Sequence, residues 1–271
     1  MQSVTNEYKK LPSATTSIIY FLTMTIIYGF MITYNIINTS SSNNDYYKSV
    51  ESNSNNQVYT LIYILFLICG TYFINVNISK SICNENTIQW NKVFFITILP
   101  WIIIFGLLYF ILELFPGWIK PFSNTIGYFI INTLGATTIL KEILKESNNI
   151  KDNNTLQTAL KNIEKNYSIF INEIDIDKNN FIQYLELLYK ENFIKEKPNT
   201  KFDDLLNNDK VKQLFALVNL KHVIGKLFWY VLAGSLIASI SYNFIINMSC
   251  EKTLKQAEKE YSDLYEKTNN P

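Results

Sequence analysis

The chain has 271 residues, of which 48% are hydrophobic, and a formal net charge of +1. Such a balanced charge gives no electrostatic basis for nucleic-acid binding. Long uncharged runs alternate with stretches dense in Lys, Glu, Asp and Asn, which is typical of a polytopic membrane protein with one soluble insert. We therefore predict an all-α polytopic membrane protein with four to five transmembrane helices and a small helical soluble insert.

Residue usage adds two constraints. All 24 basic residues are lysines, and Asn and Ile are over-used, which indicates an AT-rich genome of a protist, a bacterium or a virus of protists. Asn is therefore a background residue, and motifs built on it carry less weight. Cys69, Cys83 and Cys250 lie far apart and form no metal-binding spacing, so the sequence implies neither a redox centre nor a disulfide framework.

The first half of the chain is predicted to be a membrane domain. Residues 17–37 are uncharged, long enough to cross a hydrocarbon core of about 30 Å, and too long for a signal-peptide core. The Ser- and Asn-rich residues 38–57 suggest a flexible loop. Further spans are expected at 58–79 and 93–114, and Pro100 should kink the second of these.

The membrane domain is expected to end at residue 140, and its last stretch is ambiguous. Residues 122–140 are shorter and more polar than the other runs, and they are compatible with a packed span or with a re-entrant hairpin. A full span gives five crossings, whereas a hairpin gives four.

The second half of the chain begins with a charged region. Residues 141–220 combine frequent charge with apolar residues at helical spacing, which predicts a soluble helical insert. Residues 221–248 contain the last predicted transmembrane span, and its small-residue face is suited to helix contact, including a homo-oligomer. Residues 249–271 are predicted to form a charged helical tail.

The segment FPGWIKPFSNTIGY, which follows the third span, predicts a rigid corner at the membrane interface. We expect Pro116 and Pro121 to stop the helices on either side, and Gly117 to allow a tight reversal. Trp118 suits an interface anchor, and Ser123 or Asn124 suits an N-cap. The corner residues, which set topology or contact a partner, are Pro116, Gly117, Trp118, Pro121, Phe122, Ser123, Asn124 and Gly127.

Two ionisable residues flank this corner, and a third candidate group is the single histidine. Glu113 and Lys120 either pair with each other or extend separately to water. His222, near a predicted membrane boundary, suits an interfacial polar residue or a pH sensor, and no nucleophile pattern surrounds it. We find no catalytic set and expect no enzymatic activity. The spans contain almost no ionisable group, which disfavours transport.

The segment DIDKNNFIQYLE matches the spacing of an EF-hand loop. Its calcium ligands would be Asp175, Asp177, Asn179, the carbonyl of Phe181, and Glu186. Asn180 replaces the usual glycine at position six, and the sequence contains no second loop of this kind. The alternative is an Asx turn that starts a helix at Asn179 or Asn180. We expect no cofactor other than calcium at this loop.

Residues 116–135, PGWIKPFSNTIGYFIINTLG, resemble the PGWxxPFSNTxG signature of an inner-membrane virion protein of large nucleocytoplasmic DNA viruses, the group of phycodnaviruses and mimivirus relatives. The resemblance implies a structural protein of a giant-virus virion. It would lie in the virion internal membrane or in a host endoplasmic-reticulum-derived membrane, organise the internal lipid membrane, and contact capsid or core proteins during capsid assembly. The alternative is a cellular protist membrane protein, acting as a channel or carrier or as a calcium-responsive protein.

Overall fold

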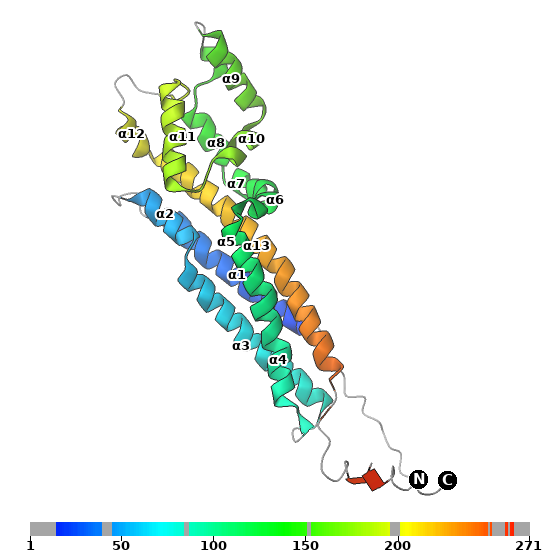
Figure 1. The fold of residues 1–271 in the computed structure, drawn as a ribbon. Helices are drawn as coiled ribbons and strands as arrows, with labels where there is room; N and C mark the ends of the chain where they lie inside the picture. The colour runs from blue at the N-terminus through cyan, green and yellow to red at the C-terminus, as the bar shows by residue number, and fades with distance from the viewer. Residues whose placement is uncertain are drawn as a thin grey trace. The chain divides into compact units, whose positions relative to one another are not determined.

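The computed structural model describes residues 15–39, 45–83, 87–150, 153–195, 201–248, 250, 258–259 and 261–262. These residues contain no β-strand, and their one isolated β-bridge joins Leu144 to Ile194. The predicted all-α fold is confirmed (Figure 1). Most of the predicted charged tail, 249–271, lies outside the described residues.

The helices follow one another with short connections. In chain order they are α1 (Thr15–Ile37), α2 (Tyr46–Ser54), α3 (Gln57–Ile82), α4 (Trp90–Pro100), the π-helical η2 (Trp101–Phe105), α5 (Gly106–Leu114), the 3-10 helix η3 (Pro116–Ile119), α6 (Lys120–Phe122), the π-helical η4 (Ser123–Gly127), α7 (Tyr128–Thr133), α8 (Ala136–Ile143), the 3-10 helix η5 (Ser147–Asn149), α9 (Asn154–Lys165), α10 (Tyr167–Glu173), α11 (Lys178–Lys190), α12 (Phe202–Leu206) and α13 (Asp209–Ile246).

Four helical stretches of the described chain are long and apolar enough to cross a membrane. They are Thr15–Ile37, Tyr46–Ile82, Trp90–Leu114 and Asp209–Ile246. The last has 38 residues and a length of about 57 Å at 1.5 Å per residue, so only part of it fits a hydrocarbon core of about 30 Å. Its uncharged portion is residues 227–246.

Residues 122–140 do not form a single spanning helix. The helix ends at Thr133, and Gly135 adopts a left-handed conformation with φ 95° before α8 begins. Glycine tolerates this conformation because it has no Cβ. The prediction of a full span here is therefore not supported, and the described residues contain four candidate crossings.

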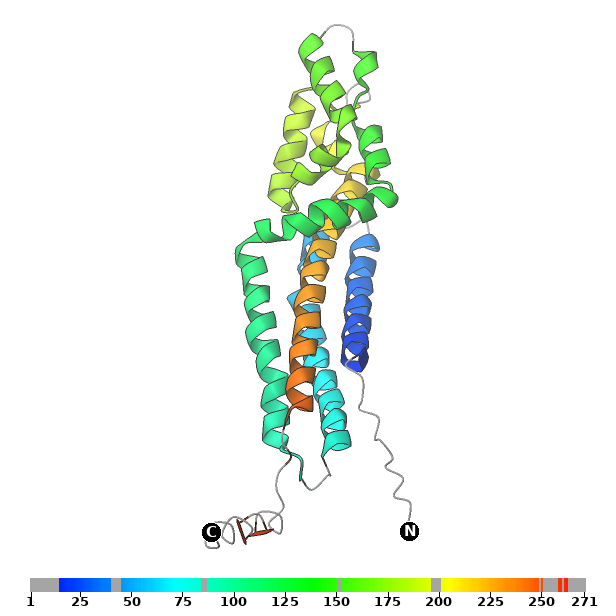
Figure 2. The same cartoon turned by 90° about the vertical axis from the view of Figure 1, so that its right-hand side faces the viewer.

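The chain divides into two compact units, each described separately. The first consists of the described residues of Met1–Met24, Leu61–Phe110 and Val231–Pro271. Segments of α1, α3, α4 and α13 pack side by side in it (Figure 2). The rings of Phe21 and Trp101 lie 5.9 Å apart, and Asn75 donates a hydrogen bond of 2.8 Å to Thr97.

Pro100 and the cysteines each shape this first unit. The π-helical turn Trp101–Phe105 follows Pro100, so the regular helix is locally distorted where a kink is predicted, and the helix continues to Leu114. Cys83 and Cys250 form a disulfide with a Cα–Cα distance of 5.6 Å. The sequence spacing of the cysteines therefore did not predict this disulfide, because the two residues are 167 positions apart in sequence and meet only in the folded chain.

The second unit consists of Thr25–Thr60 and Ile111–Tyr230. Its helices are amphipathic: α8 buries Ala136, Ile139, Leu140 and Ile143, which recur at helical spacing on one face. These residues join one hydrophobic core with α2, α11 and the N-terminal part of α13. The predicted boundaries at 140 and 220 mark changes of composition, whereas this unit combines residues from both sides of each boundary.

Residues 46–54 of the predicted flexible loop 38–57 form the helix α2. Tyr46, Tyr47 and Val50 of α2 are buried in the core of the second unit. The Tyr46 hydroxyl donates to the carbonyl of Lys212 at 3.1 Å, and the Tyr47 hydroxyl donates to that of Leu206 at 2.7 Å. Low sequence complexity concealed a short amphipathic helix that packs its aromatic side chains.

Candidate functional site

The corner after the third span begins where the sequence predicts it. Phe115 has φ −128° and ψ 74°, outside the helical region, and Pro116 opens η3. A proline disfavours helical geometry in the residue before it, so the Phe115–Pro116 pair ends α5. Gly117 has no positive φ, and open space surrounds its Cα, so the predicted tight reversal does not depend on this glycine.

The chain after Pro116 is helical up to Thr133, and we name residues 116–133 the corner helix. Pro121 lies in its early turns, where the missing N–H is tolerated, and does not stop it. Ser123 and Asn124 lie inside the π-helical segment η4 and make no capping hydrogen bond, so the N-cap prediction is wrong. Proline signals a helix start as readily as a helix end, and sequence alone did not distinguish the two.

The corner helix packs closely against α13 within the second unit (Figure 2). A Cβ on Gly127 would lie 2.5 Å from the carbonyl oxygen of Lys221. A Cβ on Gly225 would lie 2.9 Å from the backbone nitrogen of Ser123 and 2.8 Å from Ile119. The two glycines therefore permit a backbone approach that no larger residue allows without movement.

Aromatic residues join the same two helices. The Trp229 indole donates to the carbonyl of Trp118 at 2.7 Å. The ring of Phe122 lies 5.2 Å from that of Trp229 and 5.8 Å from that of Phe228. Trp118 is 52% exposed, which leaves it available to the interfacial region of a bilayer, as its predicted anchoring role requires.

Glu113 does not pair with Lys120. Its carboxylate instead accepts a hydrogen bond of 2.9 Å from the ammonium of Lys226 on α13. Lys226 is half-buried, and its second partner is the side chain of Asn55 at 3.3 Å. Glu113 therefore pairs with α13 instead of extending alone to water, whereas Lys120 is exposed, as the second alternative expects.

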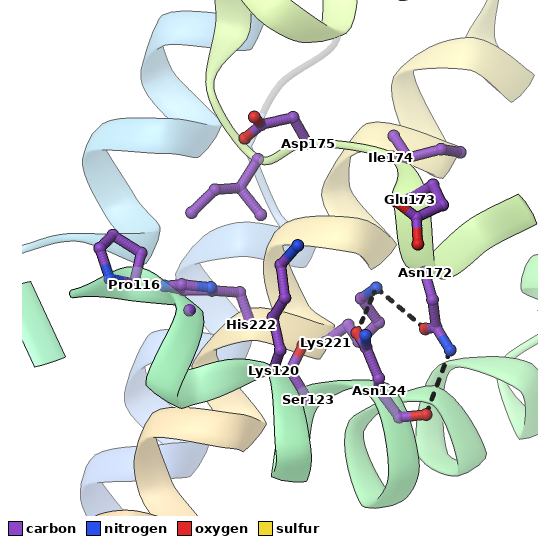
Figure 3. A pocket seen from close by; sticks show the side chains of 12 residues that line it. Pro116, Lys120, Ser123, Asn124, Asn172, Glu173, Ile174, Asp175, Lys221 and His222 are labelled. Atoms are coloured by element: carbon purple, nitrogen blue, oxygen red, sulfur yellow. Dashed lines mark hydrogen bonds between the residues drawn. The ribbon is translucent and has the colours of Figure 1, made fainter. Parts of the chain in front are cut away.

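A polar cavity of about 170 Å³ lies where the corner helix meets α13 and the segment after α10 (Figure 3). Three segments that lie apart in the sequence line it together: the corner, the start of the EF-hand-like segment, and the histidine. The lining residues are Pro116, Gly117, Lys120, Ser123, Asn124, Asn172, Glu173, Ile174, Asp175, Ile176, Lys221 and His222. Trp118, Pro121, Phe122 and Gly127 of the predicted corner do not line it.

Lys221 is the central polar group of this cavity, and only 3% of its surface is exposed. Its ammonium donates to the side-chain oxygens of Asn124 at 3.3 Å and Asn172 at 3.1 Å, and to the carbonyl of Ile171 at 3.3 Å. Asn172 also donates to the carbonyl of Asn124 at 3.2 Å. The bonds among Lys221, Asn124 and Asn172 are drawn in Figure 3, and together with the bond to Ile171 they hold the corner helix, α10 and α13 together.

Sequence reasoning missed Lys221 and Asn172 as site residues. The available signal was the position of Lys221 in a run of apolar residues on α13, where a solvated lysine would be out of place. His222, the neighbouring residue, is buried to 9% exposure and lines the cavity wall.

The EF-hand-like residues do not converge on a calcium site. Asp177 is the N-cap of α11 and accepts from the backbone N–H of Asn180 at 2.9 Å. Asp175 accepts from the N–H of Asp177 at 3.0 Å and from the side chain of Asn180. The described residues contain no group of three or more His, Cys, Asp or Glu placed to hold a metal.

The other predicted ligands have structural positions on α11. Asn179 is exposed in its first turn, Phe181 is fully buried in the core, and Glu186 pairs with Lys190 one turn later at 2.7 Å. Glu186 is about 12 Å along the helix from Lys178, too far to complete a loop around one ion. The observed arrangement is the alternative Asx-type turn, with the helix starting at Lys178.

The chain matches no known protein family, no curated protein and no solved structure. Its fold and site define the class directly. It is a helical protein with four candidate membrane-spanning helices, a composition consistent with integral insertion. The site is a polar cavity near one end of the uncharged part of α13.

Proposed function

We propose that this protein is a non-enzymatic structural protein of a membrane, which holds its helical insert, residues 141–220, folded at the bilayer surface. The observation that carries this proposal is the shared core of the second unit. Ile32 and Ile36 of α1 and Phe215 of α13 are buried in the same core as Phe181 of the insert. An insert whose core includes residues of candidate spanning helices is anchored more firmly than an insert attached by a linker.

The proposed setting is the internal membrane of a large DNA virus, with capsid or core proteins as partners. The resemblance of residues 116–135 to the viral signature supports this setting. The positions of that signature have a structural reason to be retained, because Pro116 ends α5 and Gly127 and Ser123 contact α13.

The test is mass spectrometry of gradient-purified virus particles before and after mild detergent extraction. Release of the protein together with lipid, while the major capsid protein stays in the particle, is the expected result. Crosslinking of intact particles should then join lysines of α9, such as Lys161 and Lys165, to a capsid or core protein. Absence of the protein from purified particles would reject the viral setting.

A second candidate function, a channel or carrier, is favoured by one observation. Asn75 Oδ1 and Ser79 Oγ are buried inside the first unit and have no hydrogen-bond partner. Buried polar atoms of this kind usually contact water, so a hydrated path through the first unit would satisfy both of them. The test is ion flux in liposomes that contain the full chain. Flux that disappears in Asn75→Leu would favour this function over the structural one.

A further inference from the structure

Lys221 places a buried positive charge at the wall of the polar cavity without a carboxylate beside it. Its three partners are two amide oxygens and one carbonyl, and no described carboxylate lies within ion-pair distance. Neutral acceptors satisfy the three N–H bonds of an ammonium but do not cancel its charge. A buried charge is costly unless it is paired, so an anion in the adjacent cavity would stabilise this arrangement.

The opening of the cavity carries charges of both signs. Lys120 and Glu173 are exposed there, and neither forms an ion pair with another described residue. Figure 3 shows the Lys120 side chain extending into the opening between His222 and Asn124. Asp175 also lines the opening, but its oxygens already accept from Asp177 and Asn180. The lining therefore combines two lysines with two carboxylates and attracts a group that carries both charges.

Size and depth restrict the occupant further. A cavity of about 170 Å³ suits a small polar group better than a drug-sized ligand, whose pockets measure roughly 300–1,000 Å³. Lys221 and His222 precede the uncharged residues 227–246 by one to two helical turns. Trp118 of the corner helix and Trp229 of α13, which suit the headgroup level of a bilayer, lie on the two helices that line the cavity.

We propose that this cavity binds a phosphate group linked to a primary ammonium, the chemistry of an ethanolamine-phosphate lipid headgroup. Lys120 donates to the phosphate, and the charge of Lys221 and the ring of His222 lie behind it. Glu173 accepts from the ammonium. The same chemistry exists in a free, water-soluble phosphoethanolamine compound, and the acyl chains distinguish the two sources.

The test uses the full-length chain, purified in mild detergent from nanodiscs with equal amounts of phosphatidylethanolamine, phosphatidylcholine and phosphatidylglycerol. Native mass spectrometry counts the lipids that stay bound. We expect one phosphatidylethanolamine per chain in preference to the other two lipids. Lys120→Gln removes a charge-assisted hydrogen bond and should reduce its retention about tenfold. Lys161→Gln, an exposed change on α9, is the matched control and should retain it.

Glu173→Gln tests the ammonium half of the site independently. This exposed substitution should leave the phosphate contacts intact and abolish the preference for phosphatidylethanolamine over phosphatidylglycerol. Displacement of the lipid by excess glycerophosphoethanolamine would support the same chemistry with a soluble source, whereas resistance would support the lipid. Equal retention of all three lipids by the wild type, or Lys120→Gln and Glu173→Gln behaving as the control does, would overturn the proposal.

Discussion

Replacing Gly127 with alanine should separate the corner helix from α13. The added Cβ would lie 2.5 Å from the carbonyl oxygen and 3.3 Å from the carbonyl carbon of Lys221. These are backbone atoms, so a rotation of one side chain cannot relieve the collision. Overpacking costs about 1–3 kcal/mol, and the backbone contact places this case near about 3 kcal/mol. The higher helix propensity of alanine returns about 1 kcal/mol, which leaves a net loss of about 2 kcal/mol.

Two other glycines provide matched controls for this substitution. Gly106 and Gly117 also have helical backbones, and a Cβ at either position meets no atom within 4 Å. Gly106→Ala and Gly117→Ala should therefore change the free energy of unfolding by between zero and about 1 kcal/mol in the stabilising direction. The opposite signs at Gly127 and Gly117 separate the helix contact from a general effect of glycine replacement.

The assay is unfolding in mixed micelles by titration with sodium dodecyl sulfate, followed by tryptophan fluorescence. Trp118 and Trp229 lie at the contact and report its loss. The Gly127→Ala variant should unfold at a lower detergent fraction than the wild type, and the two controls should not. Equal midpoints for Gly127→Ala and Gly117→Ala would refute the close approach of the two helices.

Three further substitutions test local features of the fold. Pro116→Ala should let α5 continue through the corner, and a changed pattern of cysteine crosslinks between the flanking helices would report it. Asp177→Ala should cost about 1 kcal/mol of stability, whereas Asp177→Asn should cost little because asparagine caps a helix equally well. A calcium-dependent stability that Glu186→Gln abolishes would contradict the capping role of Asp177. Glu113→Gln combined with Lys226→Gln should show a coupling energy of about 1 kcal/mol in a double-mutant cycle of unfolding, and additivity would contradict the pair.

The spanning helices were predictable because their signal is local. An uncharged run of about 20 residues has few alternatives to a membrane helix, and the four that the structure supports were all recognised from the sequence. Helices stabilised by long-range packing were not predictable in the same way. The segment around Tyr46 and Tyr47 is rich in Ser and Asn, and it is ordered by contacts with Lys212 and Leu206 far along the chain.

The candidate site shows the same division between local and distant information. Separate local patterns marked three residues as candidates, namely His222, Asp175 and Asn124. Only the fold brings them to one cavity. The EF-hand resemblance was misleading because carboxylates and amides both bind calcium and cap helices, and a linear spacing does not distinguish the two roles. Asp177 caps α11 here.

The disulfide and the number of spans support each other, and they lead to a prediction about sidedness. With four crossings, the loop that contains Cys83 and the segment that contains Cys250 emerge on the same side of the membrane. A fifth crossing at 122–140 would place these cysteines on opposite sides, where no disulfide could join them. Because disulfides persist in oxidising compartments, we expect this side to face such a compartment and the insert to face the reducing side.

This sidedness can be measured with a membrane-impermeant maleimide on sealed vesicles of known orientation. In the Cys69→Ser background, Cys83→Ser should expose the thiol of Cys250 to the reagent from the oxidising side, and Cys250→Ser should expose Cys83 from that same side. A cysteine introduced at exposed Lys161 of the insert should be labelled only from the other side. Labelling of Cys83 and Cys250 from opposite sides would indicate five crossings and contradict the disulfide. The two conclusions go together because an odd number of crossings between the cysteines separates them and an even number does not.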